Sequence, residues 1–128
     1  MALKVLAVDD DRMITRLVKM NLDSPNIRVT EAGNGLDCIR TICENDVDLL
    51  LLDLRLPDFS GWGILSLLRM TNSLNHIPVI LISVEPPDAA LIRQLKPDDY
   101  IQKPFDVRDL VTRVRKVIGQ KAQEGDHK

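Results

Sequence analysis

Short apolar segments alternate along the chain with longer segments whose apolar residues recur at helical spacing. The third short segment contains four consecutive leucines, which predicts a central strand that is buried on both faces. A predicted helix follows each predicted strand. The predicted strands lie at 3–8, 27–32, 47–53, 78–83 and 99–102, and the predicted helices at 14–22, 36–43, 61–72, 86–95 and 106–118.

Strict alternation of strands and helices predicts an α/β fold. Parallel strands that are joined by right-handed βαβ crossovers form a sheet with helices on both faces. We therefore expect a doubly wound (βα)5 fold on a five-stranded parallel sheet. A chain of 128 residues is long enough for one such domain and too short for two ordinary ones.

Composition narrows the class of function. Aromatic residues make up only 3% of the chain, so the core must be aliphatic, and a net charge of −2 provides no basic surface for nucleic acid or an anionic membrane. The opening MALKVLAVDD has too short an apolar segment for a signal peptide, and no apolar segment reaches the length of a membrane span, so we expect a cytoplasmic protein. Cys38 and Cys43 face different sides of a predicted helix, which excludes a disulfide between them.

Polar side chains follow the predicted strands at their carboxyl ends. Asp9 and Asp10 follow the first strand, Asp53 ends the third, Ser83 ends the fourth, and Lys103 follows the fifth. Because the carboxyl ends of parallel strands meet at one edge of a sheet, we expect these side chains to converge there. Two carboxylates about 4 Å apart repel by about 4 kcal/mol near a protein surface, so their grouping favours a cation among them. Carboxylate oxygens suit Mg²⁺ or a similar divalent ion such as Mn²⁺.

A lysine and a hydroxyl at the edge that carries the carboxylates indicate phosphoryl-transfer chemistry. The motifs in order are VDDD after the first strand, LLLLDLRLPDFSG at the third, VILIS at the fourth and DYIQKPF at the fifth. Over about residues 3–119 this set resembles the receiver domain of bacterial two-component response regulators. The resemblance implies a receiver domain at 1–121 with the flavodoxin-like strand order 2-1-3-4-5, followed by a polar, disordered tail at 122–128.

The resemblance also implies a role for each carboxylate at this edge. Asp53 would accept a phosphoryl group from the phosphohistidine of a sensor histidine kinase or of a phosphotransfer protein. Asp10, Asp53 and the backbone carbonyl of Arg55 would ligate Mg²⁺ or Mn²⁺ directly, and Asp9 would do so through water. The protein would then be a regulatory phosphoacceptor that catalyses only its own phosphorylation and dephosphorylation.

A conformational switch at the fourth and fifth strands is implied as well. Lys103 would bind a phosphoryl oxygen, and its peptide bond to Pro104 would be cis. Ser83 would hydrogen-bond the phosphoryl group, and Tyr100 would turn inward, which would bias a surface of the fourth helix, fifth strand and fifth helix toward an effector protein or an output domain. Homodimerisation through this surface is left open. Also open are a Ser83 hydroxyl satisfied by the backbone and a Tyr100 that only packs.

Several residues depart from the family pattern or have another explanation. Val84 stands where the family usually has Ala or Gly, which predicts narrow access for water and a slow loss of phosphate. Arg55 and Glu85 flank the site with opposite charges, which predicts an ion pair that acts as a lid. Pro97 should end the fourth helix early. Asp11 is predicted to be a helix N-cap and not a ligand.

Three other functions fit the residues less well. A receiver-like interaction module that needs no phosphorylation would be expected to have lost a member of the set of carboxylates, hydroxyl and lysine. An aspartyl-phosphate hydrolase of small substrates usually has a second aspartate two residues after the nucleophile, where this chain has Arg55. A flavin-binding fold needs a phosphate loop after the first strand, where the carboxylates of DDDR would repel a phosphate.

Overall fold

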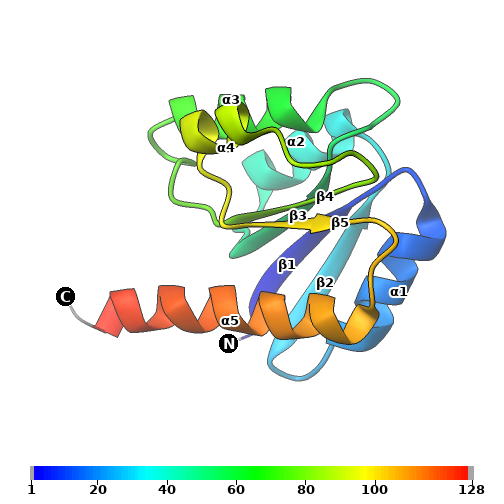
Figure 1. Ribbon diagram of the computed structural model, residues 1–128. Coiled ribbons are helices and arrows are strands. Elements are labelled where there is room, and N and C mark those ends of the chain that lie inside the picture. The colour runs from blue at the N-terminus through cyan, green and yellow to red at the C-terminus, as the bar shows by residue number, and fades with distance from the viewer. Residues whose placement is uncertain (1, 127–128) are drawn as a thin grey trace.

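The computed structural model describes residues 2–126 and consists of one five-stranded sheet between two layers of helices (Figure 1). The strand order is β2-β1-β3-β4-β5 and all neighbouring strands are parallel, which confirms the predicted α/β fold. The strands are β1 (Leu3–Val8), β2 (Ile27–Ala32), β3 (Leu49–Asp53), β4 (Val79–Ser83) and β5 (Asp99–Gln102). The helices are α1 (Arg12–Leu22), α2 (Gly35–Glu44), α3 (Gly61–Met70), α4 (Ala89–Leu95) and α5 (Val107–Asp126).

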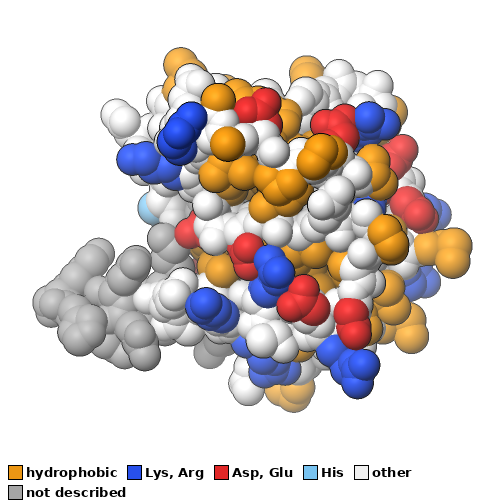
Figure 2. Space-filling view, in the orientation of Figure 1, with side chains coloured by type: hydrophobic (Ala, Val, Ile, Leu, Met, Phe, Trp, Pro, Cys, Tyr) orange, Lys and Arg blue, Asp and Glu red, His pale blue; other side chains and the backbone are white. Residues whose placement is uncertain are grey.

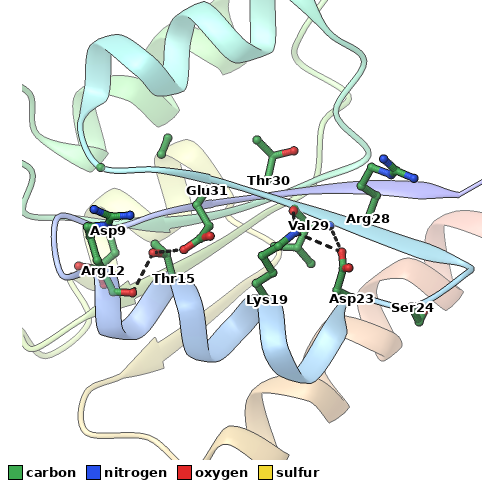
Figure 3. Close-up of a pocket in the computed structure, with 12 residues that line it drawn as sticks. Asp9, Arg12, Thr15, Lys19, Asp23, Ser24, Arg28, Val29, Thr30 and Glu31 are labelled. Carbon is green, nitrogen blue, oxygen red and sulfur yellow. Dashed lines mark hydrogen bonds and ion pairs between the residues drawn. The ribbon is translucent and has the colours of Figure 1, made fainter.

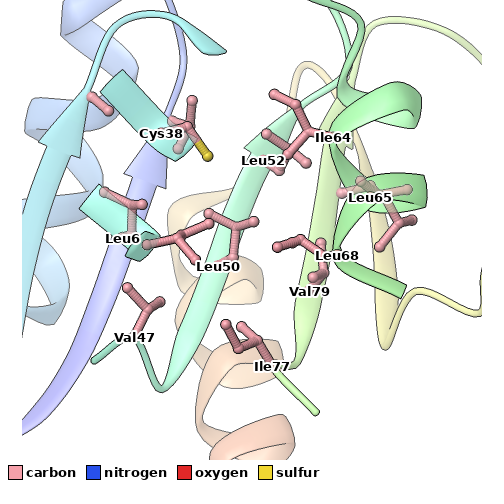
Figure 4. Close-up of a cluster of buried hydrophobic side chains, with 14 of the residues drawn as sticks. Leu6, Cys38, Val47, Leu50, Leu52, Ile64, Leu65, Leu68, Ile77 and Val79 are labelled. Atoms are coloured by element: carbon pink, nitrogen blue, oxygen red, sulfur yellow. The ribbon is translucent and has the colours of Figure 1, made fainter. Parts of the chain in front are cut away.

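Different helices cover the two faces of the sheet. Helices α1 and α5 lie on one face, and α2, α3 and α4 lie on the other (Figure 1). Successive strand residues point to opposite faces, so Leu50 and Leu52 pack toward α2 and α3 whereas Leu49 and Leu51 pack toward α1 and α5. Figure 4 shows the first of these clusters, in which Ile64 of α3 lies next to Leu52 of β3. All residues of β3 are buried, as its leucines predict.

Capping residues set where the helices begin. The Asp11 carboxylate accepts a hydrogen bond from the Met13 N–H at 3.0 Å, which confirms Asp11 as the N-cap of α1. The sequence predicts the fourth helix from 86, but α4 begins at Ala89 because the Asp88 carboxylate caps its first N–H groups. The prolines before Asp88 therefore belong to the loop between β4 and α4.

The last two helices end differently from each other. Helix α4 is short, as Pro97 predicts, and ends where Lys96 adopts a left-handed backbone with φ of 51°. Helix α5 continues beyond the predicted end at 118 as far as Asp126, in keeping with the good helix formers in the sequence after 120. The polar segment predicted as a disordered tail from 122 is thus helical to Asp126, and residues 127–128 lie outside the described residues.

The described helices contain neither a disulfide nor a membrane span. Cys38 is buried and Cys43 is exposed, so the two free thiols face different sides of α2 as predicted. Within residues 2–126, no helix combines the length and the apolar composition that crossing a membrane requires.

Candidate functional site

The carboxylates of Asp9, Asp10 and Asp53 meet at the carboxyl edge of the sheet. Asp9 and Asp10 follow β1, and Asp53 is the last residue of β3, which pairs directly with β1. One carboxylate oxygen from each lies within 4.8 Å of the other two. Asp9 and Asp53 are buried whereas Asp10 is exposed, so the cluster opens to solvent on one side. All the donors are carboxylate oxygens, and such a set suits a hard divalent cation such as Mg²⁺ or Mn²⁺.

The Lys103 ammonium contacts both buried carboxylates. Its Nζ is 2.6 Å from Oδ2 of Asp9 and 3.3 Å from Oδ2 of Asp53. Burial disfavours the charged amine, but the hydrogen bond to Asp9 and the charges of both carboxylates outweigh it, so the pKa of Lys103 is raised. Lys103 is therefore a permanent positive charge beside Asp53 at neutral pH. Its peptide bond to Pro104 is cis, as the sequence resemblance implies.

Backbone amides hold the other oxygens of the two buried carboxylates. Oδ1 of Asp9 accepts the N–H of Asp11 at 2.9 Å, and Oδ1 of Asp53 accepts the N–H of Arg55 at 3.1 Å. Burial raises the pKa of Asp9 and the charge of Asp53 adds to this, although Lys103 and the Asp11 amide act in the opposite direction. The surroundings of Asp9 thus disfavour its ionised form, and a second cation beside Lys103 would stabilise that form.

A glycine brings the start of α3 against the end of β3. A Cβ atom on Gly61 would lie 2.5 Å from the backbone oxygen of Asp53 and 2.7 Å from Cα of Leu54. The Gly61 N–H donates to the Leu54 carbonyl at 2.9 Å, and an isolated bridge joins Arg55 to Ser60. The loop between β3 and α3 is therefore closed at its base, directly beside the Asp53 backbone.

The backbone of Glu85 connects Ser83 to Tyr100. The buried Ser83 Oγ accepts the Glu85 N–H at 3.0 Å, and the Tyr100 hydroxyl donates to the Glu85 carbonyl at 2.8 Å. The half-buried Tyr100 ring lies next to Trp62 of α3, with ring centroids 6.4 Å apart. Burial raises the pKa of Tyr100, and the charges of Glu85 and Asp53 act in the same direction. The hydroxyl therefore stays protonated at neutral pH and can serve as a donor.

The side chains of Arg55 and Glu85 form the ion pair that the sequence predicts. Nη2 of Arg55 is 2.6 Å from Oε1 of Glu85, and Nε donates to the same oxygen at 2.7 Å. Both side chains are largely solvent-exposed, so the pair lies on the surface of the protein. Val84 is 54% exposed and lines an apolar groove together with Lys103 and Phe105.

Three residues that shape the surroundings of the site carry no clear signal in the sequence: Asp58, Gly61 and Trp62. The LPDFSG motif contains Asp58 and Gly61, but its spacing does not reveal their contacts. The partner of Asp58 is the backbone of Gly35, which lies 23 residues earlier in the chain. The partner of Trp62 is Tyr100, which only the fold brings near.

A groove lies beside the carboxylate cluster and not within it. It has a volume of about 780 Å³ and runs between α1 and β2, with Asp9 at one end (Figure 3). Lys19 donates to the Val29 carbonyl at 2.8 Å, and Asp23 accepts the Val29 N–H at 2.8 Å. These side chains satisfy the outer edge of β2, so we assign the groove to the packing of α1 on that strand.

Comparison with known proteins identifies the family. The model of the response regulator receiver domain matches residues 5–115. The chain belongs to this family. The receiver domain is 38% identical over 117 residues to the transcriptional regulatory protein CpxR of Klebsiella pneumoniae, covering 90% of this chain and 49% of that protein. It is 34% identical over 122 residues to the transcriptional regulatory protein ResD of Bacillus subtilis, covering 94% and 50%. The chain thus spans about half the length of the curated relatives it matches.

Solved structures agree with this assignment. The receiver domain superposes with a TM-score of 0.83 and 29% identity on the response regulator DrrB, an OmpR/PhoB homologue from Thermotoga maritima, over 94% of this chain and 54% of that one. A CheY-like receiver domain protein from Methanospirillum hungatei gives a TM-score of 0.88 at 23% identity, over 97% and 99% of the two chains. The second match shows that the two chains share the same fold over nearly their whole length.

Proposed function

We propose that this receiver domain accepts a phosphoryl group on Asp53 from a phosphohistidine of a sensor histidine kinase or a phosphotransfer protein. The observation that carries the proposal is the placement of Asp53 beside Lys103 and within reach of Asp9 and Asp10. An Asp53 oxygen forms a bond to phosphorus as the phosphorus–nitrogen bond of the donor breaks. The donor imidazole keeps the electron pair and takes up a proton, and an acyl phosphate is left on Asp53.

Each neighbour of Asp53 has a distinct task in this transfer. Lys103 binds a phosphoryl oxygen and offsets the negative charge that the group brings to a buried position. Asp10, Asp53 and the Arg55 carbonyl would hold Mg²⁺ or Mn²⁺ directly, and Asp9 would do so through water. When bound, the divalent ion supplies positive charge to the phosphoryl oxygens. The carboxylate cluster supports this assignment because its donors are all hard oxygens.

The signal leaves the site through Ser83 and Tyr100 in this proposal. Ser83 gives up the hydrogen bond that its Oγ accepts from the Glu85 N–H and donates its hydroxyl to the phosphoryl group. Tyr100 then changes position, because its hydroxyl donates to the carbonyl of the same Glu85. The surface that responds is formed by α4, β5 and α5. In Figure 2 hydrophobic side chains gather over α4 and the segment before it, while charged side chains of both signs cover α5 below them. We propose that this surface contacts an effector protein, an output domain or a second copy of the chain.

The cellular setting follows from the same reasoning. The relatives are named transcriptional regulatory proteins and are about twice as long as the match, so a DNA-binding output would lie in another domain. A net charge of −2 argues against direct binding of nucleic acid or an anionic membrane by the receiver domain itself. We propose that it acts in the cytoplasm, where sensor kinases present their phosphohistidine.

A phosphotransfer assay tests the proposal. The wild type, Asp53→Asn and the control Asp46→Asn are incubated with Mg²⁺ and a radiolabelled phosphohistidine donor, and acid-stable, base-labile label is followed. Asp46 is exposed and lies outside the carboxylate cluster, so its variant should be labelled like the wild type. Label on both but not on Asp53→Asn is the expected result. If the wild type takes no label from a donor that is active on another receiver, the protein is a phosphorylation-independent interaction module.

A further inference from the structure

The loop between β3 and α3 is tied to the start of α2 by one carboxylate. Oδ1 of Asp58 accepts the N–H of Gly35 at 2.7 Å, and Oδ2 accepts the N–H of Leu36 at 3.0 Å. The first amides of a helix have no partner within the helix, and a carboxylate is a favourable acceptor for them. The two bonds therefore join segments that lie more than 20 residues apart in the chain.

Helix α2 does not need Asp58 as its N-cap. Asn34 occupies the N-cap position, and its Oδ1 accepts the Asp37 N–H at 2.8 Å. Asp58 binds the two amides that precede this one. The contact is thus additional to an ordinary cap, and its effect falls on the loop that carries Asp58.

Close packing adds to this contact between the loop and the start of α2. A Cβ atom on Gly35 would lie 2.5 Å from Cδ2 of Phe59 and 3.1 Å from Oδ1 of Asp58, so the loop rests directly on the backbone of α2. Desolvation alone would raise the pKa of Asp58, but the N–H groups of Gly35 and Leu36, together with those of Asp58 and Phe59, lower it. The carboxylate is therefore charged at neutral pH, as a strong acceptor should be.

The hydrogen bonds of Asp58 hold the tip of the loop between β3 and α3, and Gly61 closes the base of that loop. Arg55 lies between Leu54, whose carbonyl accepts the Gly61 N–H at the base, and Asp58 at the tip, and the Arg55 N–H donates to Oδ1 of Asp53 at 3.1 Å. We propose that Asp58 is a positioning residue that holds the Arg55 backbone ready for the divalent ion, so that the loop need not become ordered when the ion binds. This inference rests on the proposed function, in which the Arg55 carbonyl is a ligand. Because preorganisation removes an ordering penalty from binding, loss of Asp58 should weaken Mg²⁺ binding.

Calorimetric titration of the folded 128-residue chain with Mg²⁺ alone tests the inference. Substitutions of groups that orient metal ligands typically weaken metal binding by 10- to 100-fold, and for the more distant Asp58→Ala we expect about tenfold. Asp58→Asn keeps one acceptor oxygen and should have an intermediate effect. The matched control is Asn34→Ala, which removes the N-cap bond of α2 but no contact with the loop, and it should bind Mg²⁺ like the wild type.

Hydrogen exchange without any metal adds a second readout. The amides of residues 54–60 should exchange faster in Asp58→Ala than in the wild type, and not in Asn34→Ala. Unchanged Mg²⁺ affinity in Asp58→Ala, or equal weakening in both variants, would overturn the inference and leave the proposed function intact. If the wild type itself binds no Mg²⁺, the proposed function fails, and this inference fails with it.

Discussion

The Arg55 guanidinium donates from Nε to Oε1 of Glu85 across 2.7 Å and so joins the loop after β3 to the loop after β4. The backbone of Glu85 is engaged at the same time, because its N–H bonds to Ser83 and its carbonyl accepts the Tyr100 hydroxyl. One residue therefore contacts both proposed switch side chains and the loop that follows the proposed phosphoacceptor. Any movement of Ser83 toward a phosphoryl group therefore breaks or shifts its hydrogen bond with the Glu85 N–H.

The ion pair of Arg55 and Glu85 should affect the rate at which phosphate is lost from Asp53 and not the stability of the fold. Arg55→Ala should speed the loss of phosphate from Asp53 by up to about fivefold, because an exposed pair is worth up to about 1 kcal/mol and that energy corresponds to such a factor. Decay of the labelled protein after removal of the donor measures this. Glu85→Ala should have the same effect, and the double variant should add little to either single one. If phosphorylation and decay rates of Arg55→Ala equal those of the wild type, the pair is not a lid.

Val84 should slow the attack of water on the phosphorylated site. It follows Ser83 directly and, at 54% exposed, lines the groove that also contains Lys103. Val84→Ala should accelerate the loss of phosphate several-fold, in the same decay assay, because a smaller side chain widens access. Leu67→Ala is a suitable control, since Leu67 is similarly exposed but lies on α3, on the opposite side of the sheet from α1 and α5. Equal decay for both variants would exclude this role of Val84.

Asp9 should lower the stability of the metal-free protein. Its pKa is raised, so the folded state binds this proton more tightly than the unfolded state does, and stability increases as pH falls through the folded pKa and is lost as pH rises. At neutral pH the ionised carboxylate is therefore unfavourable. Asp9→Asn should raise the free energy of unfolding by on the order of 1 kcal/mol, as active-site carboxylates often oppose stability.

Urea unfolding at neutral pH, without divalent ions, measures this difference. Addition of Mg²⁺ should stabilise the wild type more than Asp9→Asn, because a ligand stabilises only the state that binds it. A lower stability of metal-free Asp9→Asn would mean that the ion pair of Asp9 with Lys103 outweighs the burial of the carboxylate.

The edge that carries the carboxylates was predictable because strand ends are local signals. Four leucines before Asp53 and a short apolar run before Asp9 place both residues at carboxyl ends, and parallel topology then brings them together. The contacts of Asp58 and Trp62 were not predictable, because no strand end or charge pattern marks them. Nothing in the sequence links Asp58 to the first turn of α2 or Trp62 to Tyr100, because these pairs depend on how the loops and helices pack on the sheet. The length of α5 was underestimated because the apolar stripe used to predict it ends at Ile118.

Gly61 should be essential for the position of Asp53. A Cβ at this residue would meet the Asp53 carbonyl oxygen at 2.5 Å and Cα of Leu54 at 2.7 Å, and backbone atoms cannot rotate out of the way as a side chain can. Gly61→Ala should therefore lower the free energy of unfolding by about 1–3 kcal/mol, as overpacking does, and reduce phosphorylation of the protein that remains folded.

Gly63→Ala provides the matched control for that substitution. Gly63 lies two residues further along α3, and nothing stands within 4 Å of the position of its Cβ. Alanine is favoured over glycine in helices by about 0.5–1 kcal/mol, so Gly63→Ala should stabilise the protein slightly and leave phosphorylation unchanged. If Gly61→Ala lowers the free energy of unfolding and Gly63→Ala raises it, the loss of stability in Gly61→Ala comes from contact with the Asp53 backbone. Stabilisation by both would mean that β3 and α3 can separate without disturbing the phosphoacceptor.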